Sequence, residues 1–355
     1  MKKMRVFSGG LFLLLAVALT VLPTRCPAAE EFKPVTLKLS TYVGANTWNG
    51  ELNQYWANEV EKRTGGRIKI KIFWMDSLVK SKDALPGVQS GMTDFAWISS
   101  TYHPSNLPLL LMVDNLLNFG QDYVAATLAL LESLEKEPNL KAEMERENII
   151  LVAPHITGST LATKKCFSSI SDLKGKTVRT YGGPRIKYYE YLGMNPVFMP
   201  YSDIYEALDR GTITAFDMGV ILSTGFRHYE VVKCLYMQDI GGVIGSGIFL
   251  NMGTFKKFPA DIQKIFLDLR RDYGVYMAQK IQRDEAQYFR EWETQHGVTI
   301  RHPSPEDRAK ILDACHRAQE YIIKKQESEG HGAARKVWDF YTSALKKYEE
   351  KKSIK

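Results

Sequence analysis

The stretch SDLKGKTVRTYGGPRIKYYEYLGMNPVFMPYSDIYEALDRGTITAFDMG, residues 171–219, says more about the fold than any other part of the chain. Its pattern predicts a polar turn, a short strand, a helix, a loop, a second helix, a glycine stop and a second strand. The run from Lys176 to Arg179 is β-prone, and glycines and a proline at 182–184 end it. We therefore expect Arg179 at the carboxyl end of a strand, where open α/β sheets bind ligands.

Arg179 is a candidate anchor for an organic acid, because a guanidinium offers five fixed donors that match the fork of a carboxylate. A single arginine at a strand end more often makes a surface ion pair. The pattern around Arg179 must therefore decide between the two interpretations.

The same stretch resembles the solute-binding proteins of TRAP (tripartite ATP-independent periplasmic) transporters. It matches their pattern almost throughout: DLKG is followed four residues later by an arginine (DLKGKTVR), and then come a Gly/Pro turn and LG-x-x-P-x-x-x-P-x-S-x-x-Y-x-AL. In the last motif, x-G-x-x-D, Thr214 stands in place of the aspartate. The resemblance continues upstream in RTGGRIKIKIF, LPGVQSGMTDFAWIS and SNLPLL, and downstream in YEVVK and LNMGTFKKFPADIQ. As an ordered set these motifs are highly specific. The resemblance implies that Arg179, the arginine that follows the DLKG motif, binds the substrate carboxylate.

Residues 1–29 have the pattern of a cleaved secretory signal peptide. A basic start precedes a short apolar core at 7–22, and small residues at Ala28 and Ala29 suit cleavage. The core is short for a membrane anchor, and an arginine before Cys26 does not fit a lipoprotein signal. We therefore expect export to the periplasm of a Gram-negative bacterium.

Removal of this segment lowers the formal net charge from +7 to +3, since it contains four basic and no acidic residues. Basic and acidic residues elsewhere are interleaved, so we expect no nucleic-acid partner. The remaining 326 residues contain no second long apolar run and are enough for a soluble monomer with two lobes.

Strand and helix patterns alternate along the chain. Apolar and polar residues alternate over 35–39 and 68–72, which predicts half-buried strands, and Leu52, Trp56 and Val60 have helical spacing between them. This order predicts an α/β fold with mostly parallel sheets covered by helices. The resemblance implies the two-lobed periplasmic binding protein fold. Each lobe would be a mixed, mostly parallel sheet with flanking helices, with a ligand cleft between the lobes and long C-terminal helices bracing both.

We assign residues 30–154 and 241–284 to lobe I, and residues 155–240 and 285–350 to lobe II. The chain would cross between lobes near 153–155, 239–242 and 285.

An internal echo fits this division. Residues 85–97 and 205–217 each predict a helix, a glycine cap and a strand three residues later. Two lobes of similar construction would produce it, although helix–glycine–strand units are common in α/β proteins.

Three cysteines follow the signal segment, namely Cys166, Cys234 and Cys315, and none has metal-ligand spacing. Either Cys166 and Cys234 form a disulfide and Cys315 is buried and free, or all three are unpaired. The resemblance places Cys166 and Cys234 at sheet edges of the same lobe.

The chain lacks the common sequence motifs for catalysis and for cofactor binding. Gly175-Lys176-Thr177 looks like the end of a phosphate loop, but Ile170 stands where that loop needs a glycine. No H-E-x-x-H, G-x-G-x-x-G or G-x-S-x-G motif occurs. His155 could line a cleft, although a structural histidine is the commoner case. The sequence therefore predicts no enzyme, no cofactor and no metal.

Aromatic residues are expected at strand ends and in the loops that follow them, which suits a small-ligand site with apolar walls. We expect at least three of them to contact ligand, and the resemblance implies that Tyr201 packs over it. They are Tyr42, Trp48, Trp97, Tyr102, Tyr181, Tyr201 and Phe216.

The chain departs from several branches of the family in residues that bear on the substrate. Thr160 stands where those branches have a second arginine, and Phe216 is followed by Asp217 and Met218 where some have a Glu-Asn pair. One cationic fork would then face neutral groups, and Asp217 would repel a second carboxylate. We therefore expect a monocarboxylate with an apolar or aromatic body to bind more tightly than a C4-dicarboxylate.

The alternative is that Lys164, Lys165 or Arg185 supplies the missing cation, because long basic side chains are flexible.

The leading hypothesis is a periplasmic, non-enzymatic receptor that captures an organic acid through Arg179 and delivers it to membrane-embedded TRAP permease subunits. The resemblance implies that an ion gradient drives uptake. The alternatives are a binding protein for an ATP-driven importer or a sensor kinase, and a secreted enzyme acting on a small acid.

Overall fold

The computed structural model of this protein describes residues 1, 32–114, 117 and 121–353. The expected signal peptide, apart from Met1, lies outside the described residues. The chain divides into two units after Lys33, and the unit from Pro34 to Lys355 contains all the elements below. Among the described residues, no helix combines the length and the apolar character that a membrane span requires.

The first sheet has five strands in the order β2-β1-β3-β10-β4. Strand β1 pairs in parallel with β2 and β3, whereas β10 is antiparallel to β3 and β4. Alternation in β1 buries Leu37 and Leu39, as the sequence predicts. The strands are β1 (Val35–Ser40), β2 (Ile68–Phe73), β3 (Phe95–Ile98), β4 (Ile149–Thr157) and β10 (Val243–Asn251).

The second sheet has six strands in the order β11-β9-β5-β8-β6-β7. Strand β5 is antiparallel to β8 and β9, and the other pairs are parallel. Two mixed sheets with flanking helices confirm the predicted α/β fold class. The strands are β5 (Thr160–Thr163), β6 (Thr177–Arg179), β7 (Asn195–Val197), β8 (Ala215–Met218), β9 (Cys234–Tyr236) and β11 (Thr299–Arg301).

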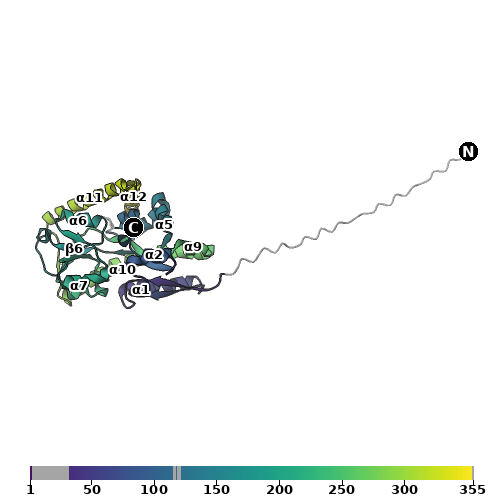
Figure 1. Ribbon diagram of the computed structural model, residues 1–355, viewed down its shortest axis with the longest axis horizontal. Coiled ribbons are helices and arrows are strands. Elements are labelled where there is room, and N and C mark those ends of the chain that lie inside the picture. The colour runs from purple at the N-terminus through teal and green to yellow at the C-terminus, as the bar shows by residue number, and fades with distance from the viewer. Residues whose placement is uncertain (2–31, 115–116, 118–120, 354–355) are drawn as a thin grey trace. The chain divides into compact units, whose positions relative to one another are not determined.

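Helices cover both sheets (Figure 1). The α-helices before β6 are α1 (Trp48–Arg63), α2 (Ala84–Gln89), α3 (Pro108–Asp114), α4 (Tyr123–Lys136) and α5 (Pro138–Arg146). Those after it are α6 (Pro184–Tyr191), α7 (Ile204–Asp209), α8 (Val220–Gly225), α9 (Met252–Lys257), α10 (Ala260–Thr294), α11 (Pro305–Ser328) and α12 (Ala334–Ser353). Short 3₁₀ turns are η1 (Ser81–Asp83), η2 (Ser100–Tyr102), η3 (Ile170–Leu173), η4 (Tyr201–Asp203) and η5 (His228–Glu230).

The long C-terminal helices are present, with one difference from the sequence expectation. The helical stretch expected from Pro305 to about Glu350 is two helices, because Gly330 has a φ of +95° between them. Helix α11 packs on α6, and α12 packs on α4 and α11 (Figure 1). Helix α10 packs on β4, α1 and α4 and also on α8, which follows β8 of the second sheet.

The internal echo is present as repeated local structure. Gly91 lies between α2 and β3 with a φ of +75°, and Gly211 lies between α7 and β8 with a φ of +76°. In both copies the backbone amide two residues after the glycine donates to the carbonyl four residues before it. The donor–acceptor distance is 3.2 Å for Thr93 to Gly87 and also for Ile213 to Ala207. Each sheet thus receives one interior strand through the same glycine-capped turn.

The chain passes between the sheets at two short connections. Strand β4 continues to Thr157, so the first connection is Gly158–Ser159 rather than 153–155. Pro154 lies within β4, which is an edge strand, where proline is tolerated. The second connection, residues 237–242, joins β9 to β10.

Cys166 and Cys234 form a disulfide, and Cys315 is a buried free thiol. This pairing is the first of the two arrangements that the sequence left open. The bridge ties the segment before η3 to the start of β9, within the second sheet.

Candidate functional site

A small cavity lies between the two sheets, with a volume of about 30 Å³. Its walls come from both sheets, and ten of its thirteen lining residues are buried. The first sheet and its loops contribute Tyr42, Trp97, Ser99, Thr101, Tyr102, His155, Thr157, Val243 and Ser246. The second sheet and its helices contribute Arg179, Tyr181, Tyr201 and Leu222.

Arg179 is the last residue of β6 and lines this cavity with a side chain that is 1% exposed. Its Nε and Nη2 atoms each donate to the Met199 carbonyl at 3.2 Å, and its Nη1 atom lies 3.5 Å from the Asp217 carbonyl. Among the described residues, no acidic side chain lies within ion-pair distance of this guanidinium. A buried charge held only by backbone carbonyls favours an anionic ligand, because burying an unpaired charge is costly.

Aromatic rings surround the guanidinium. Its central carbon lies 4.6 Å from the centre of the Tyr181 ring and 5.2 Å from that of Tyr201. Tyr42 meets Trp97 edge to face, with ring centres 5.7 Å apart. These contacts give the cation an apolar and polarisable wall, which small-ligand sites commonly have.

The cavity tyrosines are neutral hydroxyl donors at physiological pH. Burial raises the pKa of Tyr42 and Tyr181 well above the usual value, and it raises the pKa of Tyr201 to about 12. The Tyr201 hydroxyl lies 2.5 Å from the Ser223 Oγ atom. The buried Tyr181 hydroxyl makes no hydrogen bond of normal geometry to the described residues, although it interacts weakly with Tyr201, so it retains capacity to bind a ligand.

His155 faces the same cavity and is also neutral, because burial lowers its pKa to about 3. Its Nε2 atom lies 2.9 Å from the Asn49 Nδ2 atom, and its ring meets Trp97 with centres 4.6 Å apart. Among the thirteen lining residues, Arg179 is therefore the one that is charged.

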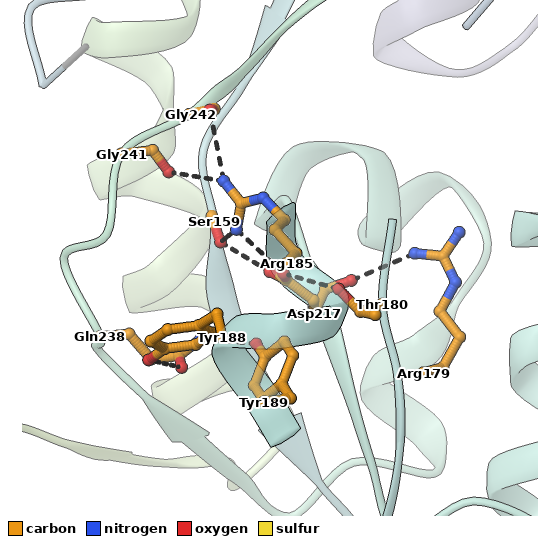
Figure 2. A network of polar contacts seen from close by, with 10 residues as sticks. All are labelled: Ser159, Arg179, Thr180, Arg185, Tyr188, Tyr189, Asp217, Gln238, Gly241 and Gly242. Carbon is orange, nitrogen blue, oxygen red and sulfur yellow. Dashed lines mark hydrogen bonds and ion pairs between the residues drawn. The ribbon is translucent and has the colours of Figure 1, made fainter. Parts of the chain in front are cut away.

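Asp217 and Arg185 form a separate buried network beside Arg179 (Figure 2). The Arg185 Nη1 atom lies 2.9 Å from Asp217 Oδ2, and neither side chain is exposed. The coulombic attraction of Asp217 helps keep the pKa of Arg185 raised despite its burial. Figure 2 shows Asp217 between the two guanidinium groups, with its carboxylate toward Arg185 and its carbonyl toward Arg179.

The structure brings six of the eleven predicted site residues to the cavity. They are Tyr42, Trp97, Tyr102, Arg179, Tyr181 and Tyr201.

The other five lie outside the lining of this cavity. Phe216, Asp217 and Met218 belong to β8, an interior strand whose side chains are fully buried against protein on both faces. Thr160 begins β5, and its hydroxyl faces the Met237 sulfur at 3.8 Å. Trp48 begins α1 and donates to the Asp284 carboxylate on α10 at 2.9 Å.

Sequence reasoning missed most of the hydroxyl-bearing wall. Ser99 and Thr101 follow β3 directly, so their place at the carboxyl end of a strand was a usable signal. Thr157 and Ser246 line the cavity from paired antiparallel strands, and no motif marks them.

None of the three alternative cations lines the cavity. Arg185 is occupied by Asp217, and Lys164 lies 3.6 Å from the Asp209 carboxylate. Lys164 and Lys165 line a different groove, beside Cys166.

Two sheets enclosing a cavity that contains one arginine define a small-ligand binding protein. Residues 39–326 match the DctP family, bacterial extracellular solute-binding protein family 7, and the chain belongs to this family. A solute-binding protein of Verminephrobacter eiseniae is 27% identical over 71% of this chain and 75% of its own length. The 2,3-diketo-L-gulonate-binding periplasmic protein YiaO of Escherichia coli is 23% identical over 64% of this chain and 69% of its own length.

Solved structures of TRAP solute-binding proteins share the fold. One from Desulfovibrio salexigens is 25% identical, covers 89% of this chain and 97% of its own, and has a TM-score of 0.72. One from Rhodoferax ferrireducens, in complex with benzoate, is 20% identical over 89% of this chain and 99% of its own, with a TM-score of 0.77.

Proposed function

We propose that this chain is the periplasmic receptor of a TRAP transporter and captures a small monocarboxylate through Arg179. The supporting observation is a buried guanidinium that faces a cavity and whose hydrogen-bond acceptors, among the described residues, are all backbone carbonyls. A carboxylate would supply two charge-assisted hydrogen bonds and the opposite charge. The loaded receptor would then deliver the acid to membrane-embedded permease subunits.

The two sheets are the two lobes in this proposal. Gly158–Ser159, residues 237–242 and helix α10 would join them, and the cavity would lie at their closed interface. Hinge closure around a ligand excludes water and strengthens the contact between Arg179 and the carboxylate.

The preference for a monocarboxylate has a different basis from the one that the sequence indicated. Asp217 does not line the cavity, and its charge is compensated by Arg185, so it is not the group that repels a second carboxylate. Arg179 is instead the only charged lining residue, so the second carboxylate of a dicarboxylate would be buried without a counter-ion.

The relatives supply supporting examples. A Nostoc relative, 28% identical over 64% of this chain and 61% of its own length, is named a monocarboxylate 2-oxoacid-binding periplasmic protein. TRAP solute-binding proteins of similar fold were solved with pyroglutamate, 3-hydroxybenzoate and benzoate. Each of these ligands carries a single carboxylate.

Calorimetric titration of the chain from residue 30 onward with pyruvate, benzoate, succinate and malate tests the proposal. We expect pyruvate or benzoate to bind more tightly than either dicarboxylate. Tight binding of succinate or malate alone would contradict the monocarboxylate class, and binding of none of the four would contradict capture of these acids.

Mass spectrometry of the denatured protein would identify an acid carried through purification. Product analysis after incubation with the same acids addresses the alternative of an enzyme. Unchanged acid supports a receptor, and catalytic turnover would contradict it.

A further inference from the structure

The ion pair of Arg185 and Asp217 is completed by a third residue, Ser159. The Ser159 Oγ atom accepts from Arg185 Nη1 at 2.7 Å and donates to Asp217 Oδ1 at 2.6 Å (Figure 2). Asp217 comes from β8 of the second sheet, and Arg185 comes from α6, which joins β6 and β7 of the same sheet. Ser159 belongs to the first connection between the sheets, so the pair anchors that connection.

The second connection reaches the same guanidinium. The Arg185 Nη2 atom donates to the carbonyls of Gly241 at 3.4 Å and Gly242 at 3.3 Å. The second connection also lies against the end of β4, directly before the first connection, because a Cβ atom on Gly242 would lie 2.8 Å from the Thr157 carbonyl oxygen. The Arg185 side chain thus contacts both short connections between the sheets.

Asp217 extends this network to the cavity arginine. Its backbone carbonyl lies 3.5 Å from Arg179 Nη1, and its Oδ2 atom lies 3.5 Å from the Thr180 hydroxyl. Strands β6 and β8 pair in parallel, with Arg179 opposite Phe216. A displacement of Asp217 would therefore change the support of the Arg179 guanidinium.

We infer that Arg185 is a positioning residue for ligand capture, which couples both connections to Arg179 through Asp217 without contacting the ligand. The inference rests on the proposed function, which assigns Arg179 to the ligand carboxylate. A buried ion pair is a poor source of stability relative to an apolar pair of the same size, but it can hold one specific geometry. Here the pair of Arg185 and Asp217 holds the two short connections and strand β6, which carries Arg179, in one fixed arrangement.

Two variants weaken this network to different degrees. Ser159→Ala removes the link to the first connection and leaves the ion pair in place. Arg185→Lys keeps the positive charge, so Asp217 is not left alone, but a lysine cannot reproduce the forked contacts to Ser159, Gly241 and Gly242.

Arg308→Met is the matched control. Arg308 Nη1 also donates to carbonyls of the second connection, those of Gln238 at 2.6 Å and Asp239 at 3.2 Å. In the part of the chain that the structure describes, Arg308 makes no hydrogen bond or ion pair with Asp217 or Ser159, so it tests whether any arginine on this connection has the same effect.

Hydrogen exchange of the unliganded protein is the first readout, because it needs no ligand. Arg185→Lys should speed amide exchange in 157–160 and 237–243 and also in 178–182, which carries Arg179. Arg308→Met should affect 237–243 only. Unchanged exchange at 178–182 in Arg185→Lys, with faster exchange at the connections, would overturn the coupling.

Titration with pyruvate and benzoate is the second readout. Arg185→Lys and Ser159→Ala should each lower the affinity for the acid that the wild type binds by about two- to thirty-fold. Arg308→Met should leave this affinity unchanged. Wild-type affinity in both variants, despite a lowered Tm, would show that the pair only stabilises the fold and would overturn the inference. Failure of the wild type to bind either acid would instead count against the proposed function.

Discussion

The Tyr123 hydroxyl lies 2.8 Å from the Glu285 Oε2 atom, which joins α4 to α10 beside the first connection between the sheets. The Gly158 backbone also lies close to this carboxyl and lowers its pKa, against the larger effect of burial. A Cβ atom at position 158 would lie 2.3 Å from Glu285 Oε1, so this contact requires a glycine. The connection is thus held on one side by Glu285 and on the other, through Ser159, by the buried ion pair.

Glu285 predicts a measurable pH dependence of stability. Burial raises its pKa from 4.5 to about 7 in the folded protein, so the folded state binds this proton more tightly than the unfolded state. Its contribution is complete below pH 4.5 and is lost as the pH rises through 7. Glu285→Gln, which cannot ionise, should lose less stability than the wild type between pH 5 and 8.

Denaturant unfolding at a series of pH values measures this difference. Glu143, whose pKa burial also raises to about 7, is unchanged in both proteins and cancels in the comparison. If the free energy of unfolding varied with pH in the same way in the wild type and in Glu285→Gln, the prediction would be contradicted.

Replacement of Arg179 should abolish acid binding and leave the fold intact. Arg179→Ala removes the charge-assisted contact, and the loss should be about 2–5 kcal/mol of binding free energy. Arg179→Lys should also bind poorly, because an ammonium cannot match both carboxylate oxygens. Calorimetry with the tighter-binding monocarboxylate measures both, and wild-type affinity in either variant would refute the role of the guanidinium fork.

Tyr181 and Tyr188 should respond in opposite ways to loss of their hydroxyls. The buried Tyr181 hydroxyl makes no hydrogen bond of normal geometry to the described residues and only a weak interaction with Tyr201, so Tyr181→Phe should change the unliganded Tm little but should weaken acid binding. The Tyr188 hydroxyl donates to Gln238 Oε1 at 2.8 Å, so Tyr188→Phe should cost about 1–3 kcal/mol of stability. Melting and titration of both variants decide the matter; a lower Tm with normal affinity for Tyr181→Phe would reverse its assignment.

Thiol counting tests the disulfide. The chain from residue 30 onward has three cysteines, and one thiol should react under denaturing conditions before reduction and three after it. Because the bridge spans a sequence separation of 68 residues, the loop-entropy estimate of its contribution is about 4 kcal/mol. Cys315→Ala should leave no reactive thiol before reduction, and three thiols in the unreduced wild type would rule the bridge out.

Local patterns predicted most of the fold, because they follow from residue periodicity and turn chemistry. The strand ending at Arg179, the glycine caps at 91 and 211 and the buried face of α1 are all local features. The position of the first connection was missed because it depends on pairing between β4 and β10, which lie far apart in the sequence. Such pairing decides whether Pro154 ends a strand or lies within one.

The site was predictable where a residue ends or follows a strand. Arg179, Tyr181 and Tyr102 satisfy this rule and line the cavity. Asp217 does not line it because its partner Arg185 comes from a different element, and no local pattern shows that pairing.

The cavity of about 30 Å³ has a consequence for the rate of uptake. It has room for roughly two or three water molecules, so an organic acid does not fit into it in this arrangement. Association must wait for a slower rearrangement of the surrounding walls. In rapid-mixing experiments the observed rate constant should therefore level off at high acid concentration, at a plateau equal to the rate of that rearrangement.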